Sequence, residues 1–292
     1  MKQHGVINWG IFILLSIIWG SSFILMKESS KDLNGWQIGA VRMFSAGLVF
    51  LPFAVVHIFQ IPLRKIPFLI LSGLLGNLLP AFLFAIAIEN VDSSLEGILN
   101  SLTPLFVIVI GILFFKAKPE PKKIAGVLIS FTGLLLLSFS KGGISITNYS
   151  SVLLVLLATV FYGLNVNVVT YFLKGINPMK MASVSLAFMG LIAAVVLWNQ
   201  NVFSIAYYDE AARTGIGYAA LLGVVGSAIA TAFFYLLIKR AGGLFASLVT
   251  YAIPIVAIGW GLLDNERITW IQVFCLVIIL AGVYLSNRSK RP

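Results

Sequence analysis

Long apolar stretches follow one another along most of the sequence, with short polar segments between them. An α-helix rises about 1.5 Å per residue, so about 20 apolar residues cross the roughly 30 Å hydrocarbon core of a bilayer. Ten stretches of about this length occur. They are Asn8–Met26, Gln37–Phe59, Ile66–Ile88, Leu95–Phe115, Lys123–Ser140, Ser151–Leu173, Met181–Trp198, Arg213–Ile238, Leu244–Leu263 and Ile268–Ser286. We therefore predict an all-α integral membrane protein with ten transmembrane helices.

The composition also requires a hydrocarbon environment. Hydrophobic residues make up 60% of the 292 residues, charged residues make up 10%, and the mean hydropathy is +1.02. A single soluble core of this chain length could not bury so much apolar surface. We expect the lipid bilayer to be the partner that covers it.

The sequence also repeats itself. The segment from Leu102 to Leu113 returns from Ala252 to Leu263, and Pro104 is matched by Pro254 at the same place in each copy. The repeat divides the chain into residues 1–146 and 147–292, with five predicted spans in each. Because five is an odd number, the second copy enters the bilayer from the opposite side, which is the inverted-repeat architecture of many secondary transporters.

The positions of Lys and Arg test this topology, since these residues concentrate in cytoplasmic loops. With the N-terminus inside, fourteen of the twenty basic residues fall on the inner face and five on the outer face, Arg42 being within a span. The inner set is Lys2, Arg64, Lys65, Lys116, Lys118, Lys122, Lys123, Lys174, Lys180, Lys239, Arg240, Arg288, Lys290 and Arg291, and the outer set is Lys27, Lys31, Lys141, Arg213 and Arg267. We predict that both termini are cytoplasmic. The same sorting explains the pI near 9.8 without a nucleic-acid partner.

Residues for catalysis or metal binding are scarce. The two histidines, His4 and His57, have no metal-ligand spacing, and the single cysteine, Cys275, cannot form an intrachain disulfide. We expect no enzymatic activity and no metal or cofactor, and proton coupling stays open. A non-transporting receptor or scaffold and a passive channel are the alternatives, but the duplication favours a transporter.

The duplicated prolines indicate where a site could form. Proline removes the hydrogen bond to the carbonyl four residues earlier, which is that of Asn100 for Pro104 and that of Thr250 for Pro254. Such breaks at membrane depth occur where the backbone is buried in protein or lines a cavity. A packing kink, satisfied by Ser and Thr side chains, is the alternative interpretation.

Charged side chains lie near these breaks. Glu96, Asn100 and Thr103 share one stripe of the predicted fourth helix, at positions i, i+4 and i+7. Arg42 lies about 8 Å inside the outer end of the second predicted helix. Arg42 could supply charge complementarity to a substrate, extend its guanidinium to the interface, or pair with Glu96. A partly desolvated Glu96 could exchange protons.

Further polar and aromatic side chains could line a substrate site. We expect Tyr251 beside Thr250, and secondary lining from Ser22, Asn77, Tyr162 and Asn165. Each could instead hold helices together or pack with its polar group satisfied. Asn165 and Asn167 lie about 200° apart on a helix, so they cannot both face one cavity. The small residues Gly215, Ala219, Gly223 and Ser227 recur every four positions and indicate close helix packing.

Several short motifs occur in a consistent order. They are Trp19–Phe23, Arg42–Phe44, Val91–Ser94 followed by Leu102–Pro104, and Ala281–Val283. Together they resemble the EamA family of the drug/metabolite transporter superfamily over nearly the whole chain. The resemblance implies a 5+5 inverted repeat and a central cavity between the halves. It also implies export of a small polar or amphipathic metabolite, such as an amino acid, through a bacterial inner membrane.

Two positions depart from the family. Its members often carry a Gly-Glu pair after the fourth and ninth spans. The second copy keeps an acid there as Asn265–Glu266, whereas the first copy has Phe115–Lys116 instead. Glu96 stands where a small apolar residue is usual. We expect alternating access by a monomer or a homodimer.

Overall fold

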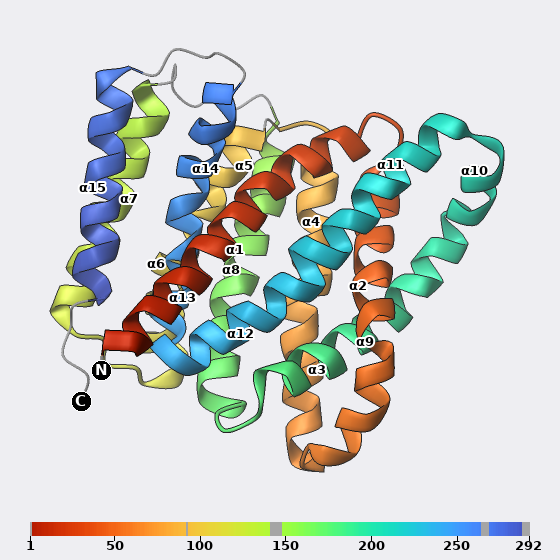
Figure 1. Ribbon diagram of the computed structural model, residues 1–292, viewed down its shortest axis with the longest axis horizontal. Coiled ribbons are helices and arrows are strands. Elements are labelled where there is room, and N and C mark those ends of the chain that lie inside the picture. The colour runs from red at the N-terminus through yellow and green to blue at the C-terminus, as the bar shows by residue number, and fades with distance from the viewer. Residues whose placement is uncertain (1, 92, 141–147, 264–268, 288–292) are drawn as a thin grey trace.

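Helices account for all the regular structure in the described part of the chain. A computed structural model describes residues 2–91, 93–140, 148–263 and 269–287 (Figure 1). The α-helices are α1 Lys2–Ser29, α2 Gly35–His57, α3 Ile66–Gly73, α4 Leu79–Ala87, α5 Ser93–Asn100, α6 Thr103–Phe115, α7 Pro121–Ser140, α8 Tyr149–Phe172, α9 Pro178–Asn199, α10 Val202–Tyr208, α11 Glu210–Leu221, α12 Ala230–Ala241, α13 Gly243–Ser247, α14 Val249–Leu263 and α15 Trp270–Asn287. Four shorter elements join them: the 3-10 turns η1 Ile58–Gln60 and η2 Leu63–Lys65, and the π-helical segments η3 Leu74–Leu78 and η4 Leu222–Ile229.

Seven helical segments in the described part of the chain are long and apolar enough to cross a membrane. They cover residues 5–29, 35–60, 63–87, 95–115, 149–172, 178–199 and 210–241. The apolar helices over residues 243–256 and 270–286 are shorter. These helices are consistent with an integral membrane protein. The count of ten spans and the cytoplasmic location of the termini stay predictions. Several positions used for them lie outside the described residues: Asp92, Lys141, Asp264, Glu266, Arg267, Ile268, Arg288, Lys290 and Arg291.

Four of the predicted spans are not regular α-helices throughout. The third contains η3 between α3 and α4, and the eighth contains η4 between α11 and α12. The fourth is divided into α5 and α6, and the ninth into α13 and α14. Hydropathy does not register such interruptions, because the residues in them are as apolar as their neighbours. The short helix α10, between α9 and α11, was not predicted.

Helices at equivalent positions of the two predicted repeats pack against each other. The second predicted span, α2, packs along the seventh, α9, and the fifth, α7, packs along the tenth, α15. Glycines allow these approaches: a Cβ atom on Gly47 of α2 would lie 2.5 Å from the Cα of Gly190 in α9. Between α7 and α15, Ser130 Oγ donates to the carbonyl of Ile279 at 2.9 Å. Figure 1 shows α7 and α15 side by side at one edge of the bundle.

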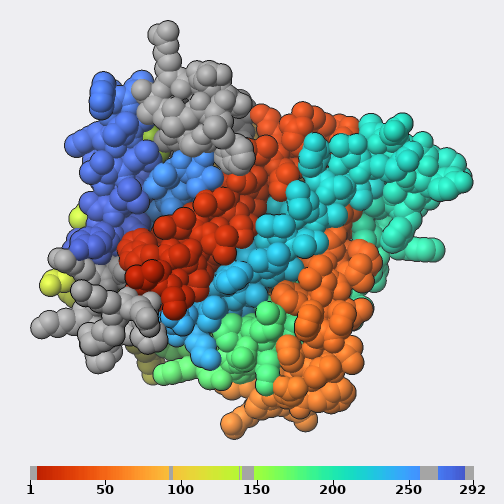
Figure 2. Space-filling view, viewed as in Figure 1, coloured from red at the N-terminus to blue at the C-terminus, as the bar shows by residue number. Residues whose placement is uncertain are grey.

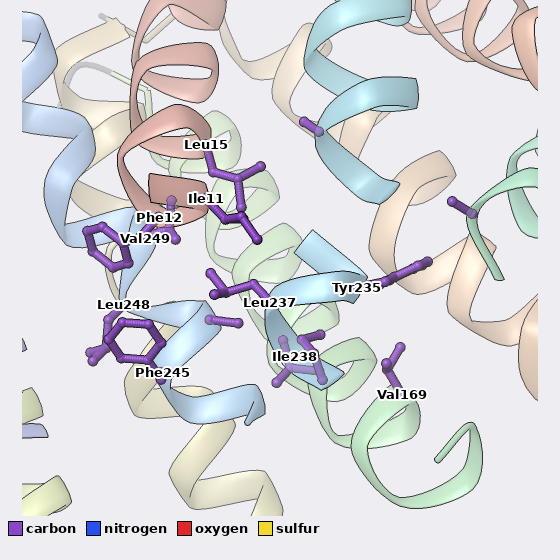
Figure 3. Close-up of a cluster of buried hydrophobic side chains, with 14 of the residues drawn as sticks. Ile11, Phe12, Leu15, Val169, Tyr235, Leu237, Ile238, Phe245, Leu248 and Val249 are labelled. Atoms are coloured by element: carbon purple, nitrogen blue, oxygen red, sulfur yellow. The ribbon is translucent and has the colours of Figure 1, made fainter. Parts of the chain in front are cut away.

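The buried core is apolar and holds α1 against the second repeat. Ile11, Phe12 and Leu15 of α1 lie close to Phe245 and Leu237 (Figure 3). The rings of Phe12 and Phe245 are 5.5 Å apart. This contact joins the start of the first repeat to α13, next to the break in the ninth predicted span.

The outer surface is also apolar. Figure 2 shows α1 lying beside α11 and α12, which follow one another end to end, with α2 next to α11. Large exposed apolar side chains occur on these and other helices, including Ile13 of α1, Leu48 of α2 and Phe274 of α15. Apolar exposure this extensive on long helices is typical of a surface that faces lipid.

Candidate substrate cavity

A cavity lies between the two predicted repeats and draws its lining from both. It contains about 910 Å³ of empty space, including the solvent at its mouth. Eight of the ten predicted site residues line it: Ser22, Arg42, Asn77, Asn100, Thr103, Tyr162, Asn165 and Thr250. Glu96 and Tyr251 are not in the lining.

Aromatic side chains form much of the apolar wall. They are Trp19, Phe23, Phe84, Tyr162, Phe234 and Tyr235. The Trp19 indole packs edge-on against Phe234 with ring centroids 5.2 Å apart, and its Nε1 donates to the carbonyl of Gly226 at 3.0 Å. Phe84 stacks on Tyr162 at 6.0 Å. Of this group only Tyr162 was predicted, because apolar aromatic residues in a hydrophobic span carry no sequence mark that separates cavity lining from lipid contact.

Arg42 lines the cavity. Its Nε donates to Ser227 Oγ of η4 at 2.8 Å, which ties α2 to the second repeat. Ser227 therefore does more than allow close packing, which was its predicted role. Gly223, one helical turn earlier, keeps that role: a Cβ atom there would lie 3.0 Å from the Cβ of Ser45 in α2.

Glu96 lies in α5, fully buried at 0% exposure. Neither carboxyl oxygen has a hydrogen-bond partner, and Arg42 is too distant for an ion pair within 4.0 Å, although the two side chains interact electrostatically. The direct pairing considered from the sequence is therefore not formed in this conformation. Burying an unpaired carboxylate is costly, so this environment favours the neutral acid.

Tyr251 is fully buried behind the cavity wall. Its hydroxyl donates to the carbonyl of Val127 in α7 at 3.2 Å. The side chain thus connects α14 to α7. The alternative interpretation from the sequence, packing with a satisfied hydroxyl, describes its contacts.

The carbonyls next to the two prolines are not left unpaired. The carbonyl of Asn100 accepts a hydrogen bond of 2.6 Å from Thr103 Oγ1. The carbonyl of Thr250 accepts one of 3.1 Å from Ser101 Oγ, which belongs to the first repeat. The expectation of unpaired main-chain oxygens at these two positions is therefore wrong. Nearby hydroxyl groups take the place of the amide donors that proline removes.

The two prolines also differ in local structure. Pro104 stands in the first turn of α6, directly after the break from α5, where a missing N–H costs little. Pro254 lies inside α14, and the break in that span comes earlier, at Leu248. The stripe of Glu96, Asn100 and Thr103 was drawn on one continuous helix, whereas Asn100 ends α5 and Thr103 begins α6.

A buried polar network crosses the cavity floor. Ser72 Oγ donates to Asn165 Oδ1 at 2.7 Å and lies 2.9 Å from the hydroxyl of Tyr235. Thr231 Oγ1 donates to Asn77 Oδ1 at 2.8 Å, while Asn77 Nδ2 is buried without a partner. An unpaired donor beside a cavity can donate a hydrogen bond to an acceptor on a ligand. Ser72, Thr231 and Tyr235 were not predicted, since single hydroxyls in apolar spans are common.

The two π-helical segments occupy equivalent positions in the two repeats. The η3 segment begins at Leu74 and η4 begins at Leu222. The first contributes Asn77 to the cavity, and the second contributes Gly226 and the Ser227 that binds Arg42. Insertions of this kind are frequent at functional sites, because they turn backbone groups and side chains away from the regular helical pattern. The sequence Leu-Leu-Gly occurs at both places, as residues 74–76 and 221–223, but it does not disclose their helix type.

A second pocket of about 1060 Å³ lies toward the end of the molecule where α1 begins. Its polar lining includes Lys118, Lys123, Asn167 and Thr170. Asn167 Nδ2 donates to the carbonyls of Val107 and Gly163, so Asn167 and Asn165 face different spaces as their helical separation required. Val166 lines both this pocket and the central cavity.

Long apolar helices around an amphipathic cavity define the class of the protein as a multi-pass membrane protein with an internal cavity. The chain belongs to the EamA-like transporter family, whose sequence model matches it twice, over residues 8–139 and 149–288. It is a multi-pass protein of the cell membrane. The recognition of this family from the short sequence motifs is confirmed.

Relatives extend over nearly the full chain. An uncharacterized transporter of Archaeoglobus fulgidus is 23% identical, with 97% of this chain and 99% of the relative covered. The uncharacterized inner membrane transporter YedA of Escherichia coli is 26% identical, with 95% and 92% covered. A solved crystal structure has the same fold, with a TM-score of 0.72, 15% identity and 95% of both chains covered. The transporter role is supported by these names.

Proposed function

We propose that the protein is a secondary transporter that moves a small amphipathic metabolite, such as an amino acid, out of the cell by alternating access. In this proposal the two repeats span the membrane five times each, in opposite orientations, with both termini in the cytoplasm. The bias of basic residues toward one face and the pairing of equivalent helices support that topology.

The central cavity carries the proposal. Arg42 of the first repeat lines it and bonds to Ser227 of the second, so movement of one repeat against the other changes the site itself. The six aromatic side chains suit an apolar part of a substrate, and Asn77, Asn100 and Thr103 suit a polar part. One chain supplies all the described lining, so a monomer holds a complete site.

The second pocket gives the cavity a continuation toward the predicted cytoplasmic end. Val166 stands between the two spaces, and packs against Gly243 of α13. In the proposed cycle, separation of α8 from α13 joins the pocket to the cavity and opens the site on that side. The opposite movement exposes the site to the other side.

Counterflow in proteoliposomes tests this function. Vesicles loaded with an unlabelled metabolite should accumulate the labelled form transiently, because a carrier exchanges one molecule for another. A channel would only equilibrate the label, and a receptor or scaffold would leave it outside. Screening a panel of amino acids and other small metabolites identifies the substrate.

A matched pair of variants ties the activity to the cavity. Arg42→Gln should abolish exchange, because it removes the charge that lines the site. Arg213→Gln removes an equivalent charge from the exposed first turn of α11 and should leave exchange unchanged. Equal exchange by both variants would contradict the assignment of this cavity.

A further inference from the structure

The buried carboxyl group of Glu96 has no structural role that its contacts explain. It makes no hydrogen bond, although it lies at 0% exposure inside a helix bundle. Buried polar groups in folded proteins are nearly always paired, and an unpaired carboxylate is among the most costly groups to bury. A chain that needed only packing here would be better served by an apolar residue.

The surroundings of Glu96 leave two titratable groups that act on it. Helix α5 packs against α1, α7, α8 and α14, and Glu96 interacts electrostatically with Arg42 and with Tyr162 of α8. The remaining titratable side chains whose burial is described on these helices lie elsewhere or are engaged. They are Lys27 and Glu28 at the end of α1, Lys122 and Lys123 at the start of α7, Tyr149 and Tyr171 toward the ends of α8, and Tyr251 bound to Val127.

The cavity, by contrast, offers positive charge and hydrogen-bond donors. Arg42 is the one charged side chain among its described lining residues. Asn77 adds a buried Nδ2 donor that has no acceptor in the described part of the chain. A substrate group that satisfies both is an anion with oxygen acceptors, of which a carboxylate is the simplest.

We infer that Arg42 is shared in turn by two anions, the carboxylate of the substrate and the carboxylate of Glu96, and that Glu96 takes up one proton when the substrate binds. This inference deepens the proposed transport function by naming the substrate as an amphipathic anion and the coupled ion as the proton. The geometry described here, with Glu96 unpaired and Arg42 lining the cavity, is that of the substrate-binding form, in which Glu96 is protonated.

The charges balance in both states. Without substrate, the guanidinium of Arg42 is neutralised by the ionised Glu96. With substrate, the substrate carboxylate neutralises Arg42, and a proton from water on the open side forms an O–H bond on Glu96. The cavity is neutral in each case, which avoids a net buried charge during the transition. Substrate and proton therefore move in the same direction, so the outward transport proposed above also carries a proton outward and is driven by the substrate gradient.

Infrared spectroscopy of the full-length protein in lipid nanodiscs tests the protonation site without a known substrate. Wild-type protein should show the carbonyl absorption of a buried carboxylic acid, which disappears as the pH is raised. Glu96→Gln should lack this band, and Glu210→Gln, at an exposed glutamate of α11, should retain it. A band that Glu96→Gln leaves intact, or its absence from the wild type, would overturn the inference.

Binding calorimetry tests the coupling, with benzoate as the probe because it joins a carboxylate to an aromatic ring. Titrations in buffers of different ionisation heat count the protons exchanged. Above the pH at which the infrared band is lost, wild type should take up about one proton per benzoate, and Glu96→Gln should bind benzoate with no uptake. Arg42→Gln should lose benzoate affinity by about tenfold or more. Proton-free binding by the wild type, or preference for neutral benzamide or cationic benzylamine, would overturn it.

The two proposals can fail separately. If a metabolite shows counterflow but no Glu96-dependent infrared band is found, the proposal of a carrier stands and the proposal of proton coupling through Glu96 fails. If the Glu96-dependent band and proton-linked benzoate binding are found but no anion shows counterflow, the inference about Arg42 and Glu96 stands and the proposal of a carrier fails.

Discussion

Ser101 Oγ donates a hydrogen bond of 3.1 Å to the main-chain carbonyl of Thr250, which lies 149 residues later in the chain. Ser101 occupies the break between α5 and α6, and Thr250 lies in the first turn of α14, just after the break that follows α13. The two interrupted spans thus meet at their interruptions. The same hydroxyl lies 2.9 Å from the carbonyl of Gly97 in α5, so it shares its one proton between that carbonyl and the carbonyl of Thr250, whose usual amide donor is replaced by Pro254.

Ser101→Ala should lower the stability of the protein by about 1–3 kcal/mol, because it leaves a buried carbonyl without a partner. It should also slow exchange, since the contact between the two breaks is lost. Ser16→Ala is the matched control: Ser16 Oγ bonds to the carbonyl of Phe12 within the same helix. Thermal unfolding in detergent and counterflow rates provide the measurements. An effect of Ser16→Ala as large as that of Ser101→Ala would contradict a special role for the contact.

Pro104→Ala and Pro254→Ala should reduce turnover while the protein still inserts and accumulates. Each substitution restores an amide that competes for a carbonyl now bound by a hydroxyl, and so favours a continuous helix. Counterflow rates normalised to the amount of inserted protein measure the effect. Pro52→Ala, at an exposed proline inside α2, controls for proline removal as such. Normal exchange by both site variants would remove the breaks from the mechanism.

The positions of the helices followed from hydropathy, but the interior of the helices did not. The prolines located the breaks in the fourth and ninth spans to within a few residues. However, whether a freed carbonyl is satisfied depends on hydroxyls that reach it from elsewhere, such as Ser101 from the other repeat. Arg42 was identified because a charge inside a span is conspicuous, while its partner Ser227 belonged to a pattern that indicated packing. Tyr235 and Trp19 are typical residues of any apolar span, and only tertiary contact separates them from the lipid-facing residues.

Gly76→Ala should disrupt the polar network at the cavity floor. A Cβ atom at Gly76, within η3, would collide with the side-chain amide of Asn165, which accepts the hydrogen bond from Ser72. Displacement of that amide should cost about 1–3 kcal/mol and weaken substrate binding. Gly217→Ala in α11 is the control, because open space surrounds that position. It should be neutral or slightly stabilising, since Ala favours a helix over Gly by about 1 kcal/mol. Unfolding and binding measurements on both variants decide this.

A disulfide between α8 and α13 should hold the cavity closed toward the second pocket. A Cβ atom on Gly243 would lie 2.6 Å from Cγ1 of Val166, which places the two Cβ atoms near the separation of about 3.5–4.5 Å that disulfides require. In a Cys275→Ala background, Val166→Cys combined with Gly243→Cys should stop exchange under oxidising conditions and recover it with a reductant. Each single cysteine variant should exchange equally well under both conditions. If the oxidised pair still exchanged at the reduced rate, α8 and α13 would not separate during transport, and the path through Val166 would have to be abandoned.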